Sequence, residues 1–303
     1  GFHRYSVDRF WNIPQAARPL AGHTGPVQIV AVSNDGKWIA TGSDDKSLRI
    51  WNVEDGAVAQ TIAPEGGAEL AAIAFQADGV QLASGDAAGT IQLSTVTDGA
   101  STGRVQAHTG AVSALSYRPD ATQLVSSGAD GLVKWWNLPL TADRTVAEIP
   151  AEITAAVSDG KTIVAGSTDG AIRQMDAAAG TQLRAFPGHT GTVVSLAMHP
   201  QGSHLASGQN DGAIRVFKAS DGVILATLRG HTGPVTSLAY HPTEPQLISG
   251  GADGTLRVWS IPDAATVTAG VATTVAAATF SADKTLLAIA GVIAGKPTIR
   301  VRN

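Results

Sequence analysis

Four histidines occupy nearly the same short sequence, and each is followed at fixed distances by residue types that could do chemistry. GHTGPV occurs at 22–27 and 230–235, AHTGAV at 107–112 and GHTGTV at 188–193. A serine or threonine follows each histidine by 18 residues, an aspartate by 22 and an aromatic residue by 28. The four sets are His23/Thr41/Asp45/Trp51, His108/Ser126/Asp130/Trp136, His189/Ser207/Asp211/Phe217 and His231/Ser249/Asp253/Trp259. Ser, His and Asp are the components of a hydrolase triad, but catalysis has no need of four equivalent triads.

The spacing of the histidines defines an internal repeat. Steps of 85, 81 and 42 residues indicate one period of about 42, with two cycles that lack the histidine. LASGDAAGTIQLS at 82–94 has Ala88 in place of the aspartate and Ser94 in place of the aromatic residue. IVAGSTDGAIRQM at 163–175 keeps Asp169 but has Met175 at the aromatic position. Residues 286–303 form the last and most divergent copy. Repeats of this length are typical of propellers and related arrays.

Each cycle predicts β structure. VQIVAVS, KWIATGS and SLRIWNV are short runs rich in β-branched and aromatic residues, and NDGK, DDKS and EDGA separate them. Asp-Gly pairs between such runs favour tight hairpin turns. No stretch longer than about ten residues has helical periodicity. Each cycle is therefore expected to form four short antiparallel strands.

The order of Gly-His, Ser/Thr, turn Asp and Trp resembles the WD-repeat β-propeller family over essentially the whole chain. The third strands end in Trp-Asn or Trp-Ser where the family often has Trp-Asp. The resemblance implies an all-β, seven-bladed propeller of four-stranded antiparallel blades in a single domain spanning 1–303. The predicted blades span 22–64, 65–106, 107–149, 150–187, 188–229, 230–270, and 271–303 together with 15–21.

The resemblance also implies a structural role for the repeated polar residues. The indole N–H of Trp can donate to the hydroxyl, and the histidine can link that hydroxyl to the carboxylate in one buried chain. Three blades keep the complete set. The Phe217 blade loses the indole donor and is expected to keep His189, Ser207 and Asp211. Of the adjacent Trp135 and Trp136, one is expected in the network and the other between blades.

Two features concern the chain ends. An N-terminal strand at 15–21 is expected to complete the last blade and seal the ring, which reduces exposed strand edges. VDRFWN at 7–12 and TIRVRN at 298–303 both have the pattern of a third strand, so either could supply it. The chain begins at Gly1 rather than Met, and we expect a processed protein or a domain excised from a longer one.

Composition excludes several classes of function. The net charge is −4, with no long basic run, so nothing predicts binding to nucleic acid. No cysteine is present, which removes disulfides and thiolate metal sites, and no apolar run predicts insertion into a membrane. No phosphate-binding loop, calcium-binding loop or cofactor motif occurs, so no cofactor and no metal are expected. A metal site from His199 and His241, each next to a proline, is a minor alternative. The composition leaves the compartment open.

The predicted function is that of a non-enzymatic scaffold, which binds a protein or peptide through loops on a rigid disc. By analogy with the family, the residues just before the turn aspartates face the partner, and Asp44, Thr168 and Asn210 are the candidates. The alternatives are a structural spacer within a larger polypeptide, or a ligand or catalytic site in the central channel. The apolar and small hydroxyl residues of VSALSY, VVSLAM and VTSLAY argue against a channel site. The regular copies are similar to bacterial members of the family.

Overall fold

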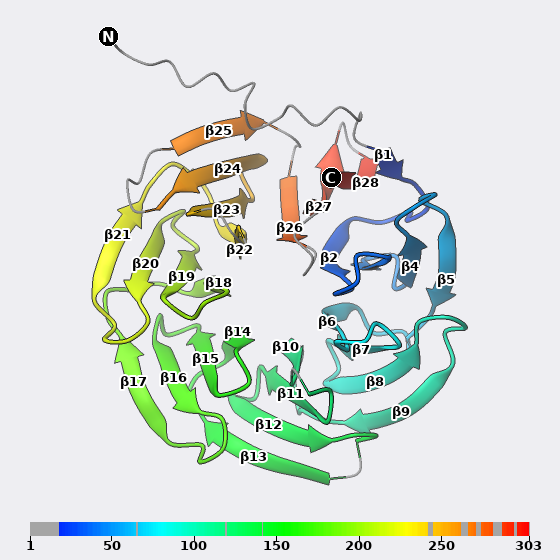
Figure 1. Ribbon diagram of the computed structural model, residues 1–303, viewed down its shortest axis with the longest axis horizontal. Coiled ribbons are helices and arrows are strands. Elements are labelled where there is room, and N and C mark those ends of the chain that lie inside the picture. The colour runs from blue at the N-terminus through cyan, green and yellow to red at the C-terminus, as the bar shows by residue number, and fades with distance from the viewer. Residues whose placement is uncertain are drawn as a thin grey trace.

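The computed structural model describes residues 18–64, 66–118, 120–140, 142–241, 245–261, 266–270, 274–280, 287–293 and 296–302. Its 28 strands form seven four-stranded antiparallel sheets, arranged as blades around a central opening (Figure 1). We number the blades 1 to 7 from β2 onward and count the strands of each blade outward from the centre. The described residues include no helix that is long and apolar enough to cross a membrane.

Blades 1 to 6 each consist of four consecutive strands. Blade 1 has β2 Val27–Val32, β3 Trp38–Ser43, β4 Leu48–Asn52 and β5 Val58–Ile62; blade 2 has β6 Leu70–Phe75, β7 Gln81–Asp86, β8 Thr90–Thr95 and β9 Ser101–Gln106. Blade 3 has β10 Val112–Tyr117, β11 Gln123–Gly128, β12 Leu132–Asn137 and β13 Ala142–Glu148; blade 4 has β14 Ile153–Ser158, β15 Thr162–Ser167, β16 Ile172–Asp176 and β17 Gln182–Phe186. Blade 5 has β18 Val193–Met198, β19 His204–Gln209, β20 Ile214–Lys218 and β21 Ile224–Leu228; blade 6 has β22 Val235–Tyr240, β23 Gln246–Gly251, β24 Thr255–Ser260 and β25 Thr266–Gly270.

Blade 7 is composite and corrects the predicted ring. Only six blades are complete within one continuous stretch of chain, because blade 7 combines β26 Thr274–Phe280, β27 Leu287–Ile293 and β28 Lys296–Arg302 with β1 from the other end. The closing strand β1 spans Arg18–Leu20 and pairs with β28, so it is shorter than the predicted 15–21. Gly22 and His23 already belong to the loop that enters blade 1, which ends the strand. The third strand of this blade is β28, and residues 7–12 lie outside the described residues.

Burial follows the position of a strand within its blade. The second strands β3, β11, β15, β19 and β23 share the pattern of one half-buried residue followed by five buried ones. The outer strand β5 is mostly exposed. Inner strands that are covered on both sheet faces by neighbouring blades read as nearly continuous apolar runs, whereas the rim is in contact with solvent. The hydrophobic core is accordingly distributed between blades, as in the cluster of Ile214, Val235 and Trp259 from blades 5 and 6.

Glycine in the second strand allows a close contact between neighbouring blades. A Cβ placed on Gly85, Gly166, Gly208 or Gly250 would lie 2.5–2.7 Å from the valine that begins the next blade. These valines are Val112, Val193, Val235 and Val275. Since real Cβ atoms do not approach this closely, glycine is required wherever the blades are packed at this distance.

The Asp-Gly turns between second and third strands also contact the following blade. Gly212 has a φ of +82°, and a Cβ there would lie 2.3 Å from the carbonyl oxygen of His231. The turn that carries one aspartate therefore packs against the loop that carries the next histidine. We call the face formed by these turns and the loops entering each blade the histidine face, and the other end of the blades the opposite face.

Candidate functional site

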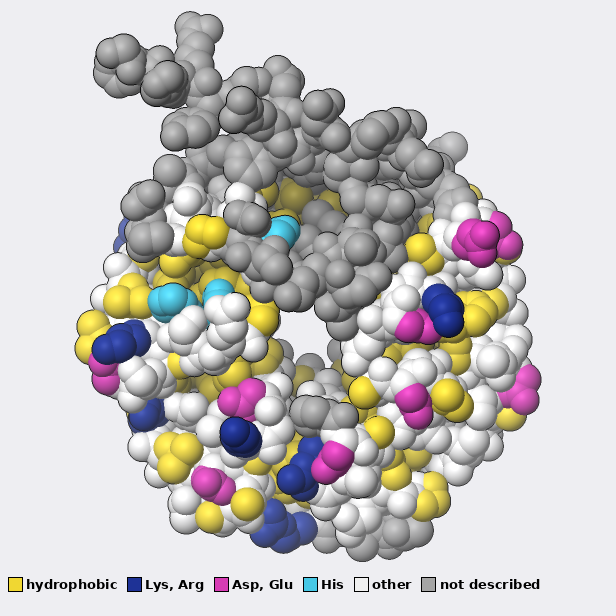
Figure 2. Space-filling view, viewed as in Figure 1, with side chains coloured by type: hydrophobic (Ala, Val, Ile, Leu, Met, Phe, Trp, Pro, Cys, Tyr) yellow, Lys and Arg dark blue, Asp and Glu magenta, His cyan; other side chains and the backbone are white. Residues whose placement is uncertain are grey.

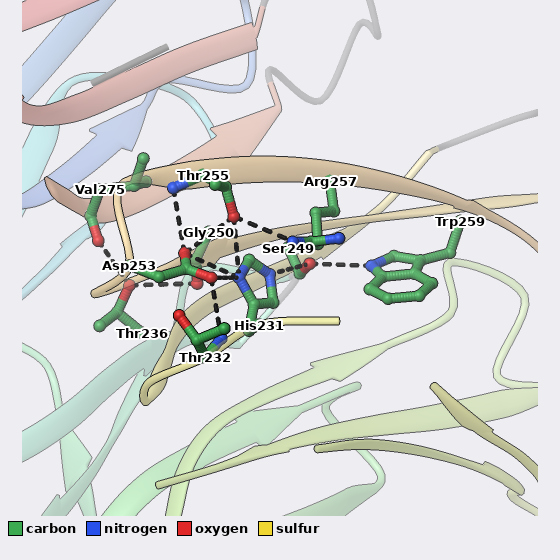
Figure 3. A network of polar contacts seen from close by, with 10 residues as sticks. All are labelled: His231, Thr232, Thr236, Ser249, Gly250, Asp253, Thr255, Arg257, Trp259 and Val275. Carbon is green, nitrogen blue, oxygen red and sulfur yellow. Dashed lines mark hydrogen bonds and ion pairs between the residues drawn. The ribbon is translucent and has the colours of Figure 1, made fainter. Parts of the chain in front are cut away.

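Blade 6 contains a continuous chain of hydrogen bonds from its tryptophan to its turn aspartate (Figure 3). The Trp259 indole N–H donates to Ser249 Oγ at 2.8 Å, and Ser249 Oγ lies 2.7 Å from His231 Nε2. His231 Nδ1 lies 3.0 Å from Asp253 Oδ1. Asp253 also accepts the backbone N–H groups of Thr232 and Thr255, each at 3.0 Å. The network thus ties the loop entering the blade to its two central strands.

Blades 1 and 3 contain the same chain. In blade 1, His23 bridges Thr41 Oγ1 at 2.7 Å and Asp45 Oδ2 at 2.9 Å, and Trp51 donates to the same hydroxyl at 2.8 Å. In blade 3, His108 lies 2.8 Å from Ser126 Oγ and 2.9 Å from Asp130 Oδ1, and Trp136 donates to Ser126 at 2.9 Å. Each four-residue set that the sequence predicted as complete is therefore connected by hydrogen bonds.

The surroundings of these histidines define one neutral tautomer. Burial lowers the pKa of His23, His108 and His231 below the ordinary value, although the neighbouring carboxylates act in the opposite direction. A carboxylate can only accept a hydrogen bond, so Nδ1 carries the proton and Nε2 accepts from the hydroxyl. Burial would raise the pKa of Asp253, but the hydrogen bonds from Thr232, Thr255 and His231 outweigh it and hold the pKa below its usual range.

These sets have the connectivity of a catalytic triad without its accessibility. Ser249 and His231 have side chains that are 0% exposed, and the serine oxygen already accepts the tryptophan N–H. A nucleophile must reach the reacting atom of a substrate, which a sealed hydroxyl cannot do. The arrangement can rigidify the blade but offers no point at which a substrate could react.

Blade 5 departs from the prediction. His189 contacts Ser207 through Nε2, but no hydrogen bond joins its ring to Asp211 within the described part of the chain. Instead, His189 Nδ1 accepts from Arg215 Nη1 at 2.7 Å, and Arg215 also donates to Gln209. With Nδ1 as acceptor, Nε2–H must donate to Ser207, so the tautomer is the reverse of that in blades 1, 3 and 6. The exposed Asp211 caps its own turn through the Ala213 N–H at 2.9 Å.

The physical reason for this departure lies in the tryptophan position. Phe217 cannot donate to Ser207, so that oxygen is free to accept from His189 Nε2–H instead. Once Nδ1 is the acceptor, a carboxylate beside it would be repulsive and a guanidinium is favourable. The replacement of Trp by Phe and the contact of Arg215 with His189 therefore belong to one altered network. Blades 1, 3 and 6 also have a basic residue at this position, namely Arg49, Lys134 and Arg257, but their histidines bond to aspartate.

Blades 2 and 4 replace the histidine network with shorter local contacts. In blade 2, the buried Asp86 accepts the N–H groups of Ala88 at 2.9 Å and Thr90 at 2.8 Å. In blade 4, Asp169 accepts from the Ser167 hydroxyl and pairs with Arg173 at 3.3 Å. Both sets stabilise the turn between the second and third strands but do not reach the loop entering the blade.

Two hydroxyl groups take part in these networks but were not predicted from the sequence. Ser47 Oγ donates to Asp45 Oδ1 at 2.6 Å and lies 3.2 Å from His23 Nδ1. Thr255 Oγ1 occupies the same place in blade 6, at 2.8 Å from Asp253 Oδ1. A hydroxyl residue two positions after the turn aspartate could have indicated this contact in blades 1 and 6. Blade 3 has Leu132 at that position, so the pattern is not shared by all three complete networks.

The adjacent tryptophans divide their roles as predicted. Trp136 belongs to the network of blade 3, whereas Trp135 points to blade 4 and donates its indole N–H to the carbonyl oxygen of Ala177 at 2.7 Å. Trp135 packs in one cluster with Ile163 and Met175 of blade 4.

The candidate partner-binding residues occupy equivalent places on the histidine face. The backbone N–H groups of Asp44, Thr168 and Asn210 each donate to a carbonyl just before the first strand of their own blade, namely those of Pro26, Glu152 and Thr192. All three residues are exposed. Asp44 Oδ2 accepts from Gln28 Nε2 at 3.0 Å. These positions lie close to the inner strands and hence to the central opening.

The histidines outside the networks form no metal site among the described residues. The ring of His199 lies 5.5 Å from that of His204 and 5.2 Å from that of Tyr240. Its Nδ1 is 3.0 Å from the Ser203 hydroxyl. No group of three or more His, Asp or Glu that could hold a metal occurs in the described ranges.

Comparison with known proteins defines the family. The family model described as WD domain, G-beta repeat matches residues 15–52, 99–137, 180–218 and 222–260, about half of the chain. The chain therefore belongs to the WD40 repeat family. Each matched segment contains one of the four histidines and ends just after the aromatic residue of the third strand, so the matched repeats are the blades with the repeated polar sets.

This chain is similar to its relatives over part of its length, and it spans less than two thirds of the length of each. It is 30% identical over 132 residues to apoptotic protease-activating factor 1 of Rattus norvegicus, covering 43% of this chain and 8% of that protein. It is 29% identical to WD repeat-containing protein 3 of Mus musculus, covering 46% and 15%. It is 27% identical to the guanine nucleotide-binding protein subunit beta of Oryza sativa subsp. japonica, covering 61% and 53%. These relatives are eukaryotic, so the similarity to bacterial members stays a prediction.

Proposed function

We propose that this propeller is a non-enzymatic scaffold that binds a protein or peptide on its histidine face. Membership of the WD40 family supports this, because its propellers generally bind protein partners. The observation that carries the proposal is the contrast between sealed networks and exposed turn residues. His231 and Ser249 are inaccessible, whereas Asp44, Thr168 and Asn210 are exposed at equivalent turns of blades 1, 4 and 5.

The contacts between inner strands argue against a ligand site in the central channel. Thr154 Oγ1 donates to the carbonyl oxygen of Val193, and Thr236 Oγ1 donates to that of Val275 at 2.6 Å. Ser195 Oγ donates to the carbonyl oxygen of Val235 at 2.8 Å. These hydroxyls connect neighbouring blades instead of converging on a shared point, so they support the ring and not a bound ligand.

Affinity capture with a face-specific variant tests the proposal. The bait is the chain itself, compared with a variant carrying Asp44→Arg, Thr168→Arg and Asn210→Arg. A matched control carries arginine at Thr61, Gln182 and Thr227, which are exposed on the outer strands of the same three blades. We expect a prey that is retained by the control and lost from the face variant.

The possible outcomes separate the alternatives. Loss of the prey from both variants would place binding elsewhere or reflect general charge effects, and would refute the proposed face. A folded bait that retains no prey from any source extract would favour the spacer function. Thermal unfolding of all three proteins checks that the substitutions leave the fold intact.

A further inference from the structure

A cavity of about 540 Å³ lies between blades 3 and 4 on the opposite face. Blade 3 contributes Arg118 from the turn between β10 and β11, Trp135 from β12 and Arg144 from β13. Blade 4 contributes Lys161 from the turn between β14 and β15, and Asp176 at the end of β16. Lys and Arg side chains gather over this junction of β12, β13 and β15 in the lower part of Figure 2.

The lining of the cavity carries an excess of positive charge. Arg118, Arg144 and Lys161 contribute three cations against the single carboxylate of Asp176. The whole chain has a net charge of −4, so this concentration of cations is opposite in sign to the average surface. Asp176 is already engaged, because its Oδ1 accepts the N–H groups of Ala178 at 2.8 Å and Ala179 at 2.7 Å.

The cations remain available for an incoming anion. Lys161 is exposed, and within the described residues its ammonium makes no ion pair. Arg118 pairs with Asp120 through Nε at 3.3 Å, but both side chains are about half exposed, and such surface pairs are weak. Arg118 Nη1 also donates to Gln123 Oε1 at 2.9 Å, which leaves the Nη2 donors for a ligand. Arg144 makes a 3.3 Å contact from Nη2 to the Ala177 carbonyl, which leaves the other guanidinium donors for a ligand.

Trp135 makes the wall of the cavity rigid. Blades 1, 2, 5 and 6 have Ile50, Leu93, Val216 and Val258 at the position before their own aromatic or equivalent residue. In blade 3 the larger indole is 5% exposed and bonded to Ala177 of the next blade. The side chains that carry charge therefore surround a fixed surface, which reduces the entropic cost of ordering the site.

We propose that this cavity binds a phosphate monoester group. Its volume lies in the range of about 300–1,000 Å³ found for small-molecule sites. A phosphate monoester carries a charge of about −1.5 to −2 at neutral pH and three acceptor oxygens, which match a net excess of two cations. Guanidinium groups bind such oxygens through paired N–H donors. A ligand with one carboxylate would carry a charge of only −1 and would leave part of the positive charge of the cavity unbalanced. The site is independent of the proposed partner face.

Isothermal titration with defined probes tests the site. The probes are free O-phosphoserine and a pentapeptide with phosphoserine flanked by glycines, with the unmodified serine and the glutamate peptides for comparison. We expect saturable binding of the phosphorylated probes only. A peptide that binds more tightly than the amino acid indicates a modified polypeptide as the source, and equal binding indicates a small phosphorylated compound.

Matched variants locate the binding. Lys37 in blade 1 occupies the position of Lys161 in blade 4. The carbonyl oxygen of each lysine accepts the N–H of the residue directly after the third strand of its blade, Val53 and Ala177 respectively. Lys161→Glu should weaken binding by about tenfold or more, since it removes a charged contact and adds a repulsive charge. Lys37→Glu changes the net charge equally and should leave binding unchanged.

Three results would overturn the proposal: no saturable binding of either phosphorylated probe, equal weakening by Lys37→Glu, or equally tight binding of the glutamate peptide. Arg118→Gln provides a second variant if Lys161→Glu lowers the unfolding temperature.

Discussion

Replacement of Asp253 by alanine tests whether the buried network stabilises the propeller. The Asp253 side chain is 7% exposed and accepts from His231, Thr232 and Thr255. Alanine removes these bonds and leaves the Nδ1–H of a fully buried imidazole with only the Thr255 hydroxyl, 3.1 Å away, as an acceptor. Loss of one member of a buried network costs about 3 kcal/mol in unfolding free energy. The expected decrease in unfolding temperature is about 5–10 °C for a domain of this size.

Asp211→Ala is the matched control, because Asp211 has the same position in blade 5 but no bond to its histidine. It loses a single turn bond to the Ala213 N–H on an exposed residue, so the expected cost is about 0.5–1 kcal/mol. The assay is denaturant unfolding of both variants beside the unaltered chain. Equal destabilisation by the two substitutions would refute the network argument, because only the position in the turn would then matter.

Four further predictions follow from the same contacts. Gly250→Ala should destabilise by about 1–3 kcal/mol, because its Cβ would lie 2.5 Å from Val275, and Val275→Ala should restore part of the loss in a double-mutant cycle. In ¹⁵N NMR, His231 should show the Nδ1–H tautomer and His189 the Nε2–H tautomer; the same tautomer at both would contradict the assignment. Burial keeps the pKa of these histidines below 6.5, so the unfolded chain takes up protons first as the pH falls. Stability should therefore be full above about pH 7 and decrease below 6.5, as denaturant titration at several pH values can show. Blades 2 and 4 should exchange amide hydrogens faster than blades 1, 3 and 6, and equal protection would argue against a rigidifying role of the networks.

Much of the fold could be predicted because the repeat displays it several times. Four copies of a histidine at a constant distance from Trp or Phe define the period, and the Asp-Gly turns mark the strand ends. The sequence also predicted that the chain ends share blade 7, since 271–303 provides only three strands. It could not determine the length of β1, because Arg18, Pro19 and Leu20 have no alternation to mark where pairing with β28 stops.

The polar networks were predictable only where every member was present. His231, Ser249 and Asp253 could be assigned because their donors and acceptors match without further residues. The partner of His189 could not be assigned, because Arg215 lies 26 residues away and the basic residues at that position in blades 1, 3 and 6 stand beside histidines that bond to aspartate. The basic cavity could not be predicted from the sequence either, because only the packing of blades 3 and 4 brings together its cations, Arg118, Arg144 and Lys161.

Blade 5 shows what the repeat must preserve. Its Asp211 is intact in sequence but does not contact the histidine, and its Phe217 lacks the indole donor, yet His189 still has a partner for each ring nitrogen. An unpaired polar group in the interior costs more than a changed partner, so substitutions that preserve the pairing of donors and acceptors are tolerated. Loss of a tryptophan therefore permits reversal of the histidine tautomer when a cation replaces the carboxylate. What the four histidine-containing blades have in common is thus a buried imidazole with a hydrogen-bond partner for each ring nitrogen. The Trp-Ser-His-Asp network and the Ser-His-Arg network of blade 5 are two arrangements that provide these partners.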